Sequence, residues 1–342
     1  MGKIVTFGEI LLRLSTPSYS TIDRSQSLLV NYGGAEANVC VSLAHLGHDT
    51  FFMTKLPDNK ISDGVISYLR SNGVNTDYIK KGSTTIGIYF LETGFGGRPS
   101  KVIYNRKHSA FTRVEISDFD WCNIFKGADW FHVSGITLAL GEKVRELAFK
   151  ALEEAKKHNV KISFDFNYRK TLWTEQEAKK VYFEFMKYVN ILFCSFWDAN
   201  SLLDIPLSQE LKDATLSIRR KDVFTKLIKK YNLDYVFGTD REVFSATENA
   251  LSAYYYALKG NNVINGSTPS VSFKIYDRIG GGDAFAAGII HGLLKNFNDP
   301  EYAIKFGLSN GILKHTIYGD AAIFNEEDVE TFMNNSSAEV SR

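Results

Sequence analysis

The stretch "ADWFHVSGITLALGEKVRELAFKALEEAKKHNVKISFDFN", residues 128–167, decides the fold class. Short apolar runs at 128–135 and 160–167 flank a segment at 141–159 whose apolar residues recur at helical spacing. Strands separated by amphipathic helices are typical of βαβ units in a parallel sheet. The same alternation continues downstream, with a helix expected at 174–188, a strand at 189–194, a helix at 221–232 and a strand at 234–239. The chain is therefore predicted to be an α/β protein, doubly wound, with a mostly parallel sheet flanked by helices.

Residues 86–111, "IGIYFLETGFGGRPSKVIYNRKHSAF", depart from this alternation. Two β-rich runs flank a Gly/Pro turn, which indicates a hairpin rather than a βα unit. Together with residues 12–32, this hairpin is expected to form a small antiparallel β-sheet lid over the main sheet. No linker rich in Pro, Gly or Ser divides the chain. We therefore expect one domain over residues 1–335 that includes the lid, followed by a frayed tail at 336–342.

Composition excludes several classes of partner. The chain has 342 residues, and 40 basic against 39 acidic side chains leave a formal charge of +1. This balance gives no electrostatic footprint for nucleic acid or an anionic membrane, and no signal peptide or membrane-spanning run is apparent. Cys40, Cys122 and Cys194 form no C-x-x-C pair, which favours reduced thiols over a disulfide framework. A cytoplasmic protein without nucleic-acid or membrane partners is expected.

The segment "YDRIGGGDAFAAGIIHG", residues 276–292, carries the strongest chemical signal. Gly280, Gly281 and Gly282 can expose successive backbone N–H groups, and the apolar helix that follows adds its own unpaired donors. Such a helix start is an anion-binding site. Two interpretations of Asp283 stay open here. It caps the helix, or it takes a proton from an attacking hydroxyl while the donors hold a phosphoryl group.

The dinucleotide-binding motif of oxidoreductases is not fulfilled. "GFGGRP" at 94–99 begins like G-x-G-x-x-G, but Pro99 stands where the third glycine belongs and no helix follows. No Walker A loop is present in the sequence, and the seven histidines do not cluster at ligand spacing. A nicotinamide-dependent oxidoreductase is therefore disfavoured.

Two segments resemble a known family. "DRIGGGDAFAAG" is similar to the second signature of the ribokinase-like (PfkB) carbohydrate kinases, and "GGAEANVCVSLAHLG" at 33–47 is similar to the first. Both occur in the family's order, with the hairpin where the family has its lid. The resemblance implies a ribokinase-like fold, ATP with Mg²⁺, Asp283 as general base and Gly280 to Gly282 as the anion hole. Because a helix N-terminus favours a charged acid, we expect a lowered pKa for Asp283, so that positioning matters more than basicity.

The remaining polar residues bear on the substrate. Arg13 in "GEILLRL" stands near a position where relatives acting on neutral sugars carry an aspartate, so it either suits an anionic substrate or points to solvent. Arginines of the hairpin and of "DFNYRKTLW" are suited to bind a carboxylate, whereas hairpin tyrosines are also good cross-strand packers. These arginines and tyrosines resemble the substrate-binding residues of the 2-keto-3-deoxygluconate kinases of the family. This implies the substrate residues Gly34, Tyr89, Tyr104, Arg106, Arg169 and Asp320.

For the nucleotide, Thr239 and Arg241 in "FGTDREV" follow a predicted strand and are expected at phosphate or ribose. Arg278 is expected near the ATP phosphates and Asn310 near the adenine. Many relatives hold Mg²⁺ through an N-x-x-E motif, and "CSFWDANSLL" offers Ser195 and Asp198 at this place. Asp198 retains a carboxylate and is the metal candidate.

These observations predict an ATP-dependent kinase that phosphorylates the terminal hydroxyl of 2-keto-3-deoxygluconate. A fructokinase or another neutral-sugar kinase of the same family is the alternative. A non-catalytic sugar-binding relative is a third interpretation, kept open by the altered metal motif. We expect a homo-oligomer, with an edge of the lid hairpin as the dimer surface.

Overall fold

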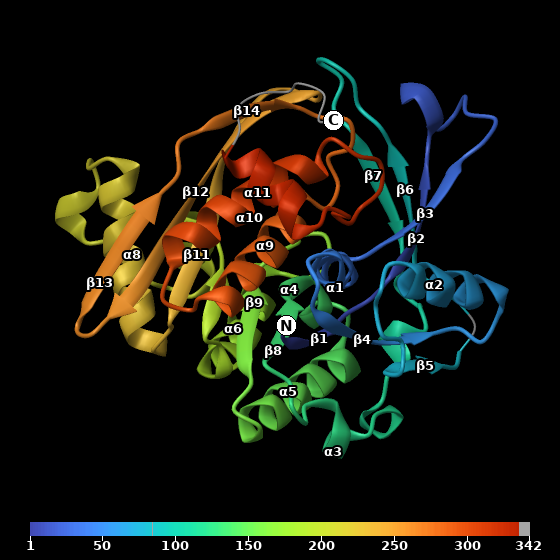
Figure 1. The fold of residues 1–342 in the computed structure, drawn as a ribbon, viewed down its shortest axis with the longest axis horizontal. Coiled ribbons are helices and arrows are strands. Elements are labelled where there is room, and N and C mark those ends of the chain that lie inside the picture. The colour runs from blue at the N-terminus through green and yellow to red at the C-terminus, as the bar shows by residue number, and fades with distance from the viewer. Residues whose placement is uncertain (84, 335–342) are drawn as a thin grey trace.

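The computed structural model describes residues 1–83 and 85–334; the predicted tail at 336–342 lies outside this part. Figure 1 shows one large twisted sheet between two layers of helices, with a small second sheet at one end. The large sheet has the order β13-β12-β11-β10-β9-β8-β1-β4-β5, and β14 pairs with β12. Its strands are β1 (Lys3–Phe7), β4 (Asp49–Leu56), β5 (Ile79–Lys81), β8 (Trp130–Ser134), β9 (Lys161–Asp165), β10 (Ile191–Phe193), β11 (Tyr235–Ser245), β12 (Glu248–Lys259), β13 (Asn262–Ser267) and β14 (Val271–Lys274).

Neighbouring strands from β11 to β5 pair in parallel, whereas β12 pairs antiparallel with β11, β13 and β14. Helices α1 (Ala35–His45), α9 (Gly281–Lys295) and α10 (Pro300–Lys314) bury apolar side chains against one face. Helices α5 (Glu142–Lys157), α6 (Glu175–Phe185) and α8 (Leu216–Tyr231) cover the other. The predicted doubly wound α/β fold is confirmed. The other α-helices of the described residues are α2 (Lys60–Ser71), α3 (Trp121–Ile124), α4 (Gly135–Leu138), α7 (Phe196–Leu202) and α11 (Glu326–Asn334).

The small sheet has the order β3-β2-β6-β7 and is the predicted lid. Its strands are β2 (Leu11–Ser15), β3 (Leu29–Gly33), β6 (Ile88–Glu92) and β7 (Lys101–Asn105). The hairpin prediction holds, because β6 and β7 pair antiparallel. The prediction of a wholly antiparallel lid is wrong, because β2 and β6 pair in parallel, with Arg13 opposite Tyr89. The reason is connectivity: the chain passes through α1, β4, α2 and β5 of the main layer before it returns to the lid.

Two boundaries between residues 216 and 245 differ from the sequence prediction. Helix α8 begins at Leu216 rather than near 221, and β11 continues to Ser245 instead of ending at 239. The extension of β11 is polar but pairs with β12 over its length. Its tip reaches the lid hairpin, where the N–H of Ala246 donates to the Gly96 carbonyl at 2.7 Å.

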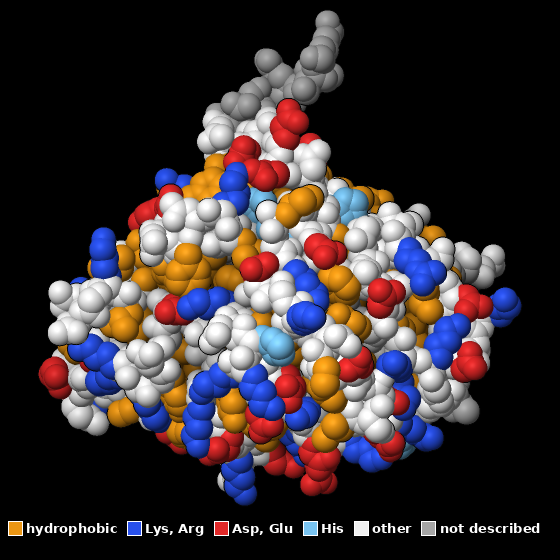
Figure 2. Space-filling model, turned by 60° about the horizontal axis from the view of Figure 1, so that its bottom comes forward, with side chains coloured by type: hydrophobic (Ala, Val, Ile, Leu, Met, Phe, Trp, Pro, Cys, Tyr) orange, Lys and Arg blue, Asp and Glu red, His pale blue; other side chains and the backbone are white. Residues whose placement is uncertain are grey.

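The lid stands over the edge of the main sheet where the parallel strands have their carboxyl ends (Figure 1). Ligands of open α/β sheets bind at this edge. On the face shown in Figure 2, Lys and Arg side chains are interspersed with Asp and Glu. No helix in the described part of the chain combines the length and apolar character needed to cross a membrane.

Candidate active site

Two adjoining pockets lie at the carboxyl edge of the main sheet. The first, about 320 Å³, lies under the lid and is lined by residues from β2, β6, α1 and the start of α9. The second, about 270 Å³, lies beside the end of β10 and residues 237–239 within β11. Asp165, Asn167, Arg169 and Gly282 line both pockets. A ligand that fills the first pocket therefore faces a ligand that fills the second across Gly282.

The glycine loop is shaped by two close approaches. Gly280 has φ +84°, and a Cβ there would lie 1.6 Å from the carbonyl oxygen of Asp320. A Cβ at Gly281 would lie 2.2 Å from Cε1 of His315. Nothing lies within 4 Å of such an atom at Gly282, which is exposed and opens to both pockets. The first two glycines therefore let the chain pack against its neighbours, and the third presents its backbone to the pockets.

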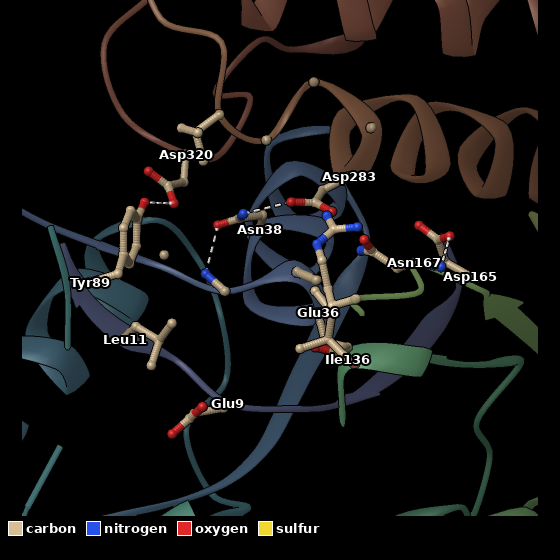
Figure 3. Close-up of a pocket in the computed structure, with 18 of the residues that line it drawn as sticks. Glu9, Leu11, Glu36, Asn38, Tyr89, Ile136, Asp165, Asn167, Asp283 and Asp320 are labelled. Carbon is tan, nitrogen blue, oxygen red and sulfur yellow. Dashed lines mark hydrogen bonds between the residues drawn. The ribbon is translucent and has the colours of Figure 1, made fainter. Parts of the chain in front are cut away.

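Asp283 lies in the first turn of α9, whose N-cap is Gly280. Its Oδ2 accepts a 2.7 Å hydrogen bond from Nδ2 of Asn38, whose Oδ1 accepts one from the N–H of Gly34 (Figure 3). Burial, followed by the nearby carboxylates of Glu36 and Asp320, raises the pKa of Asp283 to about 7. The predicted lowering is wrong, because the helix end and the Asn38 bond do not offset desolvation and like charge.

The lid supplies one wall of the first pocket. Tyr89 is buried and its hydroxyl donates to Oδ2 of Asp320 (Figure 3). Tyr104, opposite it on β7, is 50% exposed, with the two ring centroids 5.7 Å apart. Arg106 follows β7, and its Nε donates to Oε2 of Glu9 at 2.7 Å. Glu9 is 3% exposed, and its Oε1 has no partner among the described residues.

The opposite wall follows strand β9. Asp165 ends the strand, and its Oδ1 accepts from the N–H of Asn167 at 3.1 Å. Burial, followed by the charge of Asp283, raises the pKa of Asp165 to about 7, and Arg169 opposes this shift. Arg169 is exposed at the junction of the two pockets. An arginine and two carboxylic acids thus meet where the pockets join.

The second pocket contains Thr239 of β11 and the pair Ser195 and Asp198 at the start of α7. The Ser195 hydroxyl donates to Oδ2 of Asp198 at 2.7 Å, which forms a capping box. Within the described ranges, no cluster of three or more His, Cys, Asp or Glu is placed to hold a metal ion alone. A metal ion at this place would need additional oxygen ligands from a bound molecule, as Mg²⁺ takes from phosphate groups.

Comparison with known proteins identifies the family of this chain. Residues 1–327 match the model of the family described as pfkB family carbohydrate kinase. This chain belongs to the pfkB family of carbohydrate kinases. The match confirms the resemblance of the two signatures, and kinases of this family use ATP.

Three relatives are similar over nearly their whole length. A 2-dehydro-3-deoxygalactonokinase of Haloferax volcanii is 30% identical, with 100% of this chain and 99% of that protein covered. A 2-dehydro-3-deoxygluconokinase of Thermoproteus tenax is 29% identical, with 94% and 90% covered. The crystal structure of a 2-dehydro-3-deoxygluconokinase from Thermotoga maritima is 41% identical with a TM-score of 0.91, with 98% of this chain and 100% of that chain covered.

In this pfkB kinase, most predicted site residues come together. The first pocket brings together the residues predicted for catalysis and substrate with Arg278, and the second contains Thr239 and Asp198. Arg241 lines neither pocket; its guanidinium donates to Nε2 of His315 at 3.4 and 3.5 Å. Burial and then the charge of Arg278 lower the pKa of Arg241 to about 10. Arg241 therefore lies behind the glycine loop, close to Arg278.

Two further residues that the sequence singled out, Asn310 and Arg13, also line neither pocket. Asn310 is fully buried, and its Nδ2 donates to the carbonyl of Ala284 at 2.7 Å and to the Ser42 hydroxyl at 3.1 Å. It joins α10 to α9 and α1 and lines neither of the two pockets. Arg13 neither lines the first pocket nor points to solvent, because its side chain is 1% exposed and paired with Asp277 and Asp320.

Sequence reasoning missed several pocket residues. Asn38 lies inside the first signature, four positions after Gly34. The signal available for it was a polar residue among the apolar residues of a predicted helix. Asp165 and Asn167 end the strand that also delivers Arg169, so the strand-end rule that selected the arginine applies to them equally. Glu9 and Glu36 had no comparable signal, because only the fold brings their carboxylates beside the pocket.

Proposed function

We propose that this carbohydrate kinase transfers the γ-phosphoryl group of ATP to the terminal hydroxyl of 2-keto-3-deoxygluconate. The observation that carries the proposal is the presence of Arg106 and Arg169 in the same pocket as Asp283. Two guanidinium groups suit a sugar that carries a carboxylate. The three relatives above act on 2-dehydro-3-deoxy sugar acids by name, which supports the same substrate class.

Residues of the first pocket have different roles in the proposed phosphoryl transfer. Asp283 accepts the proton of the attacking hydroxyl, and its raised pKa suits a base near neutral pH. Asn38 holds the carboxylate in place through its 2.7 Å hydrogen bond. The N–H groups at the start of α9 stabilise the charge on the transferring group. Under the lid, Asp320 accepts a hydrogen bond from a sugar hydroxyl. The Tyr89 hydroxyl, which donates its proton to Asp320, presents its oxygen as an acceptor.

Arg106 is already paired with Glu9, which shapes how it can bind an acid sugar. Nε and Nη2 both contact Oε2 of Glu9, at 2.7 and 2.5 Å. Nη1 makes no hydrogen bond to a described residue, so a ligand carboxylate can take this donor while Glu9 fixes the guanidinium plane. Arg169, exposed on the opposite wall, supplies the second positive charge.

The same pair supports the alternative, a fructokinase or other neutral-sugar kinase. Glu9 partly neutralises Arg106, and its unpartnered Oε1 is an acceptor suited to a hydroxyl group. A panel of acid and neutral sugars in a coupled ATP-consumption assay separates the two functions. We expect turnover on 2-keto-3-deoxygluconate and its galactonate epimer to exceed turnover on fructose and ribose. The reverse order would replace this proposal by the alternative, and inactivity on every sugar would favour a non-catalytic relative.

Mg²⁺ is proposed to accompany ATP in the second pocket. Asp165 and Asp198 both line it and are close enough for the charge of Asp198 to raise the pKa of Asp165. Carboxylate oxygens with phosphate oxygens form the usual ligand set of this ion, so the residues fit it. The ion would neutralise phosphate charge during transfer. In the same assay, chelation with EDTA is expected to abolish ATP consumption, and full activity without divalent cations would refute this assignment.

Arg106→Ala is expected to raise KM for the acid sugar about 10–100-fold, because a charge-assisted hydrogen bond is lost. KM for ATP should stay within about twofold of wild type, since Arg106 lies on the lid side and not in the second pocket. Steady-state kinetics with each substrate varied in turn measures both constants.

The matched control is Arg98→Ala, which removes another arginine of the lid hairpin, paired with Glu92 at 3.1 Å and absent from both pockets. It should leave both KM values near wild type. Equal sugar KM values for the Arg106 and Arg98 variants would remove Arg106 from substrate binding.

A dimer through the lid is also proposed. Every residue of β7 is exposed, with Val102 at 37% and Ile103 at 55%, on an edge of the lid sheet. An exposed apolar edge strand is suited to pair with another chain. Light scattering coupled to gel filtration should give twice the 38.5 kDa chain mass; the mass of one chain would contradict it.

A further inference from the structure

Arg13 lies at the centre of a buried charged cluster that adjoins the first pocket but, apart from Asp320, does not line it. Its Nη1 donates to Oδ1 of Asp320 and its Nη2 to Oδ2 of Asp277, both at 2.6 Å. The three side chains are 1 to 5% exposed. Arg13 belongs to lid strand β2, whereas the two aspartates belong to the segments before α9 and after α10. One side chain thus ties the lid to two loops of the main domain.

Asp277 orders the approach to the glycine loop. Its Oδ1 accepts from the N–H of Ile279 and its Oδ2 from the N–H of Gly319, each at 3.1 Å. Lys314, fully buried on α10, donates from Nζ to the Asp277 carbonyl at 3.3 Å. The segment that leads into Gly280 is therefore held by bonds from several elements. Among these partners, Arg13 belongs to the lid.

Asp320 carries the cluster into the substrate pocket. Its carbonyl oxygen packs against Gly280, and its Oδ2 would lie 1.9 Å from a Cβ at Gly33. Its carboxylate lines the first pocket and accepts from the Tyr89 hydroxyl. The Asp320 carboxylate is therefore closely packed. Arg13 donates to its Oδ1, and Tyr89 donates to its Oδ2.

We propose that Arg13 is a positioning residue, which keeps Asp320 ionised and oriented as an acceptor for a sugar hydroxyl. The proposal rests on the proposed function, because it assumes that Asp320 contacts the sugar. An ionised carboxylate accepts hydrogen bonds from sugar hydroxyls, whereas a protonated one offers a donor of its own. Without Arg13, the two buried aspartates would lose the guanidinium that contacts both of them, and buried carboxylates that lose a positive partner take up protons more readily.

The charges around Asp320 set the direction of the effect. Burial raises its pKa, and Arg13 and the Tyr89 hydroxyl oppose that rise. Removing Arg13 therefore raises the pKa of Asp320 further, so ionisation, and with it sugar binding, is lost at a higher pH than in wild type. The groups that face Asp320 and remain in such a variant are Tyr68 on α2, Tyr89 on β6, Asp277, Asp283 on α9 and Lys314 on α10.

The test compares wild type, Arg13→Gln, Arg13→Lys and the lid control Arg98→Gln by steady-state kinetics between pH 5.5 and 9, with melting temperatures recorded. For Arg13→Gln, we expect KM for the sugar acid to rise about 10–100-fold at pH 6 and to fall as pH increases. KM for ATP should stay within about twofold. Arg13→Lys should be intermediate, because it keeps the charge but cannot bond both carboxylates in a fork. Arg98→Gln should follow the wild-type profile.

If Arg13→Gln melts at a lower temperature but shares the sugar KM and pH profile of Arg98→Gln, Arg13 is only a structural ion pair and the proposal is overturned. If Arg13→Gln does not fold, Arg13→Lys decides, with an unchanged sugar KM counting against the proposal. Failure of the proposed function shows up separately. A wild-type enzyme that prefers a neutral sugar overturns the acid-sugar assignment alone, because the variants are then compared on that sugar. An inactive wild type overturns both.

Discussion

Asp283→Asn is expected to lower kcat about 10²–10⁴-fold, the usual cost of losing a general base. Asparagine keeps the shape and can still accept the hydrogen bond from Asn38 Nδ2, but it cannot take a proton. Wild-type kcat should rise as pH increases through about 7, the pKa of Asp283, because only the ionised form acts as base. The remaining activity of the Asp283→Asn variant should not show this pH dependence. Rapid-quench or steady-state kinetics across pH measures both effects.

The matched control is Asp299→Asn, which changes an acid at the start of α10 whose side chain accepts from the N–H of Tyr302 at 3.0 Å. Asparagine caps a helix about as well as aspartate, so this variant loses only the negative charge at the helix N-terminus, worth about 0.3–1 kcal/mol of stability, and should keep its kcat. Near-normal turnover of a folded Asp283→Asn enzyme would remove Asp283 from the mechanism.

Gly280→Ala is expected to lower kcat about 10²-fold or more, the scale of losing one donor of an anion hole. Gly280 has φ +84°, which strains any L side chain, and the added Cβ would lie 1.6 Å from the Asp320 carbonyl. Either the loop or Asp320 must move. Both line the first pocket, so anion binding and sugar binding should weaken together. Steady-state kinetics reports this as a lower kcat with a higher sugar KM.

Gly260→Ala separates backbone strain from the collision. Gly260 also has a positive φ, +58°, but nothing lies within 4 Å of a Cβ there, and it lies between β12 and β13, outside both pockets. We expect a loss of about 1 kcal/mol of stability with unchanged kinetics. If the two alanine variants show the same kinetics, the close packing of Gly280 on Asp320 has no role in catalysis.

Local sequence patterns predicted much of the fold and of the site. The alternation of strands and helices, the lid hairpin and the glycine loop before α9 each depend on neighbouring residues in the chain, and the structure contains them. The residues predicted for substrate binding also lie in one pocket. The family signatures and the strand-end rule select such residues without knowledge of their partners.

The electrostatic environment could not be predicted in this way. The pKa of Asp283 is raised first by burial and then by the carboxylates of Glu36 and Asp320, which are far away in the sequence. Arg13 was expected at the substrate or in solvent, and the fold instead buries it between Asp277 and Asp320. Asn310 has the polarity of a ligand contact, yet it bonds helix to helix. In each case the partner that fixes the role comes from a distant segment.

Analysis of the reaction product tests the central claim most directly. The wild-type protein is incubated with ATP, Mg²⁺ and 2-keto-3-deoxygluconate, and the products are examined by ³¹P NMR and mass spectrometry. The account predicts one phosphomonoester on the terminal carbon of the sugar acid, formed in equal amount to ADP. Free phosphate without a sugar phosphate, or a phosphoryl group at another position, would contradict it.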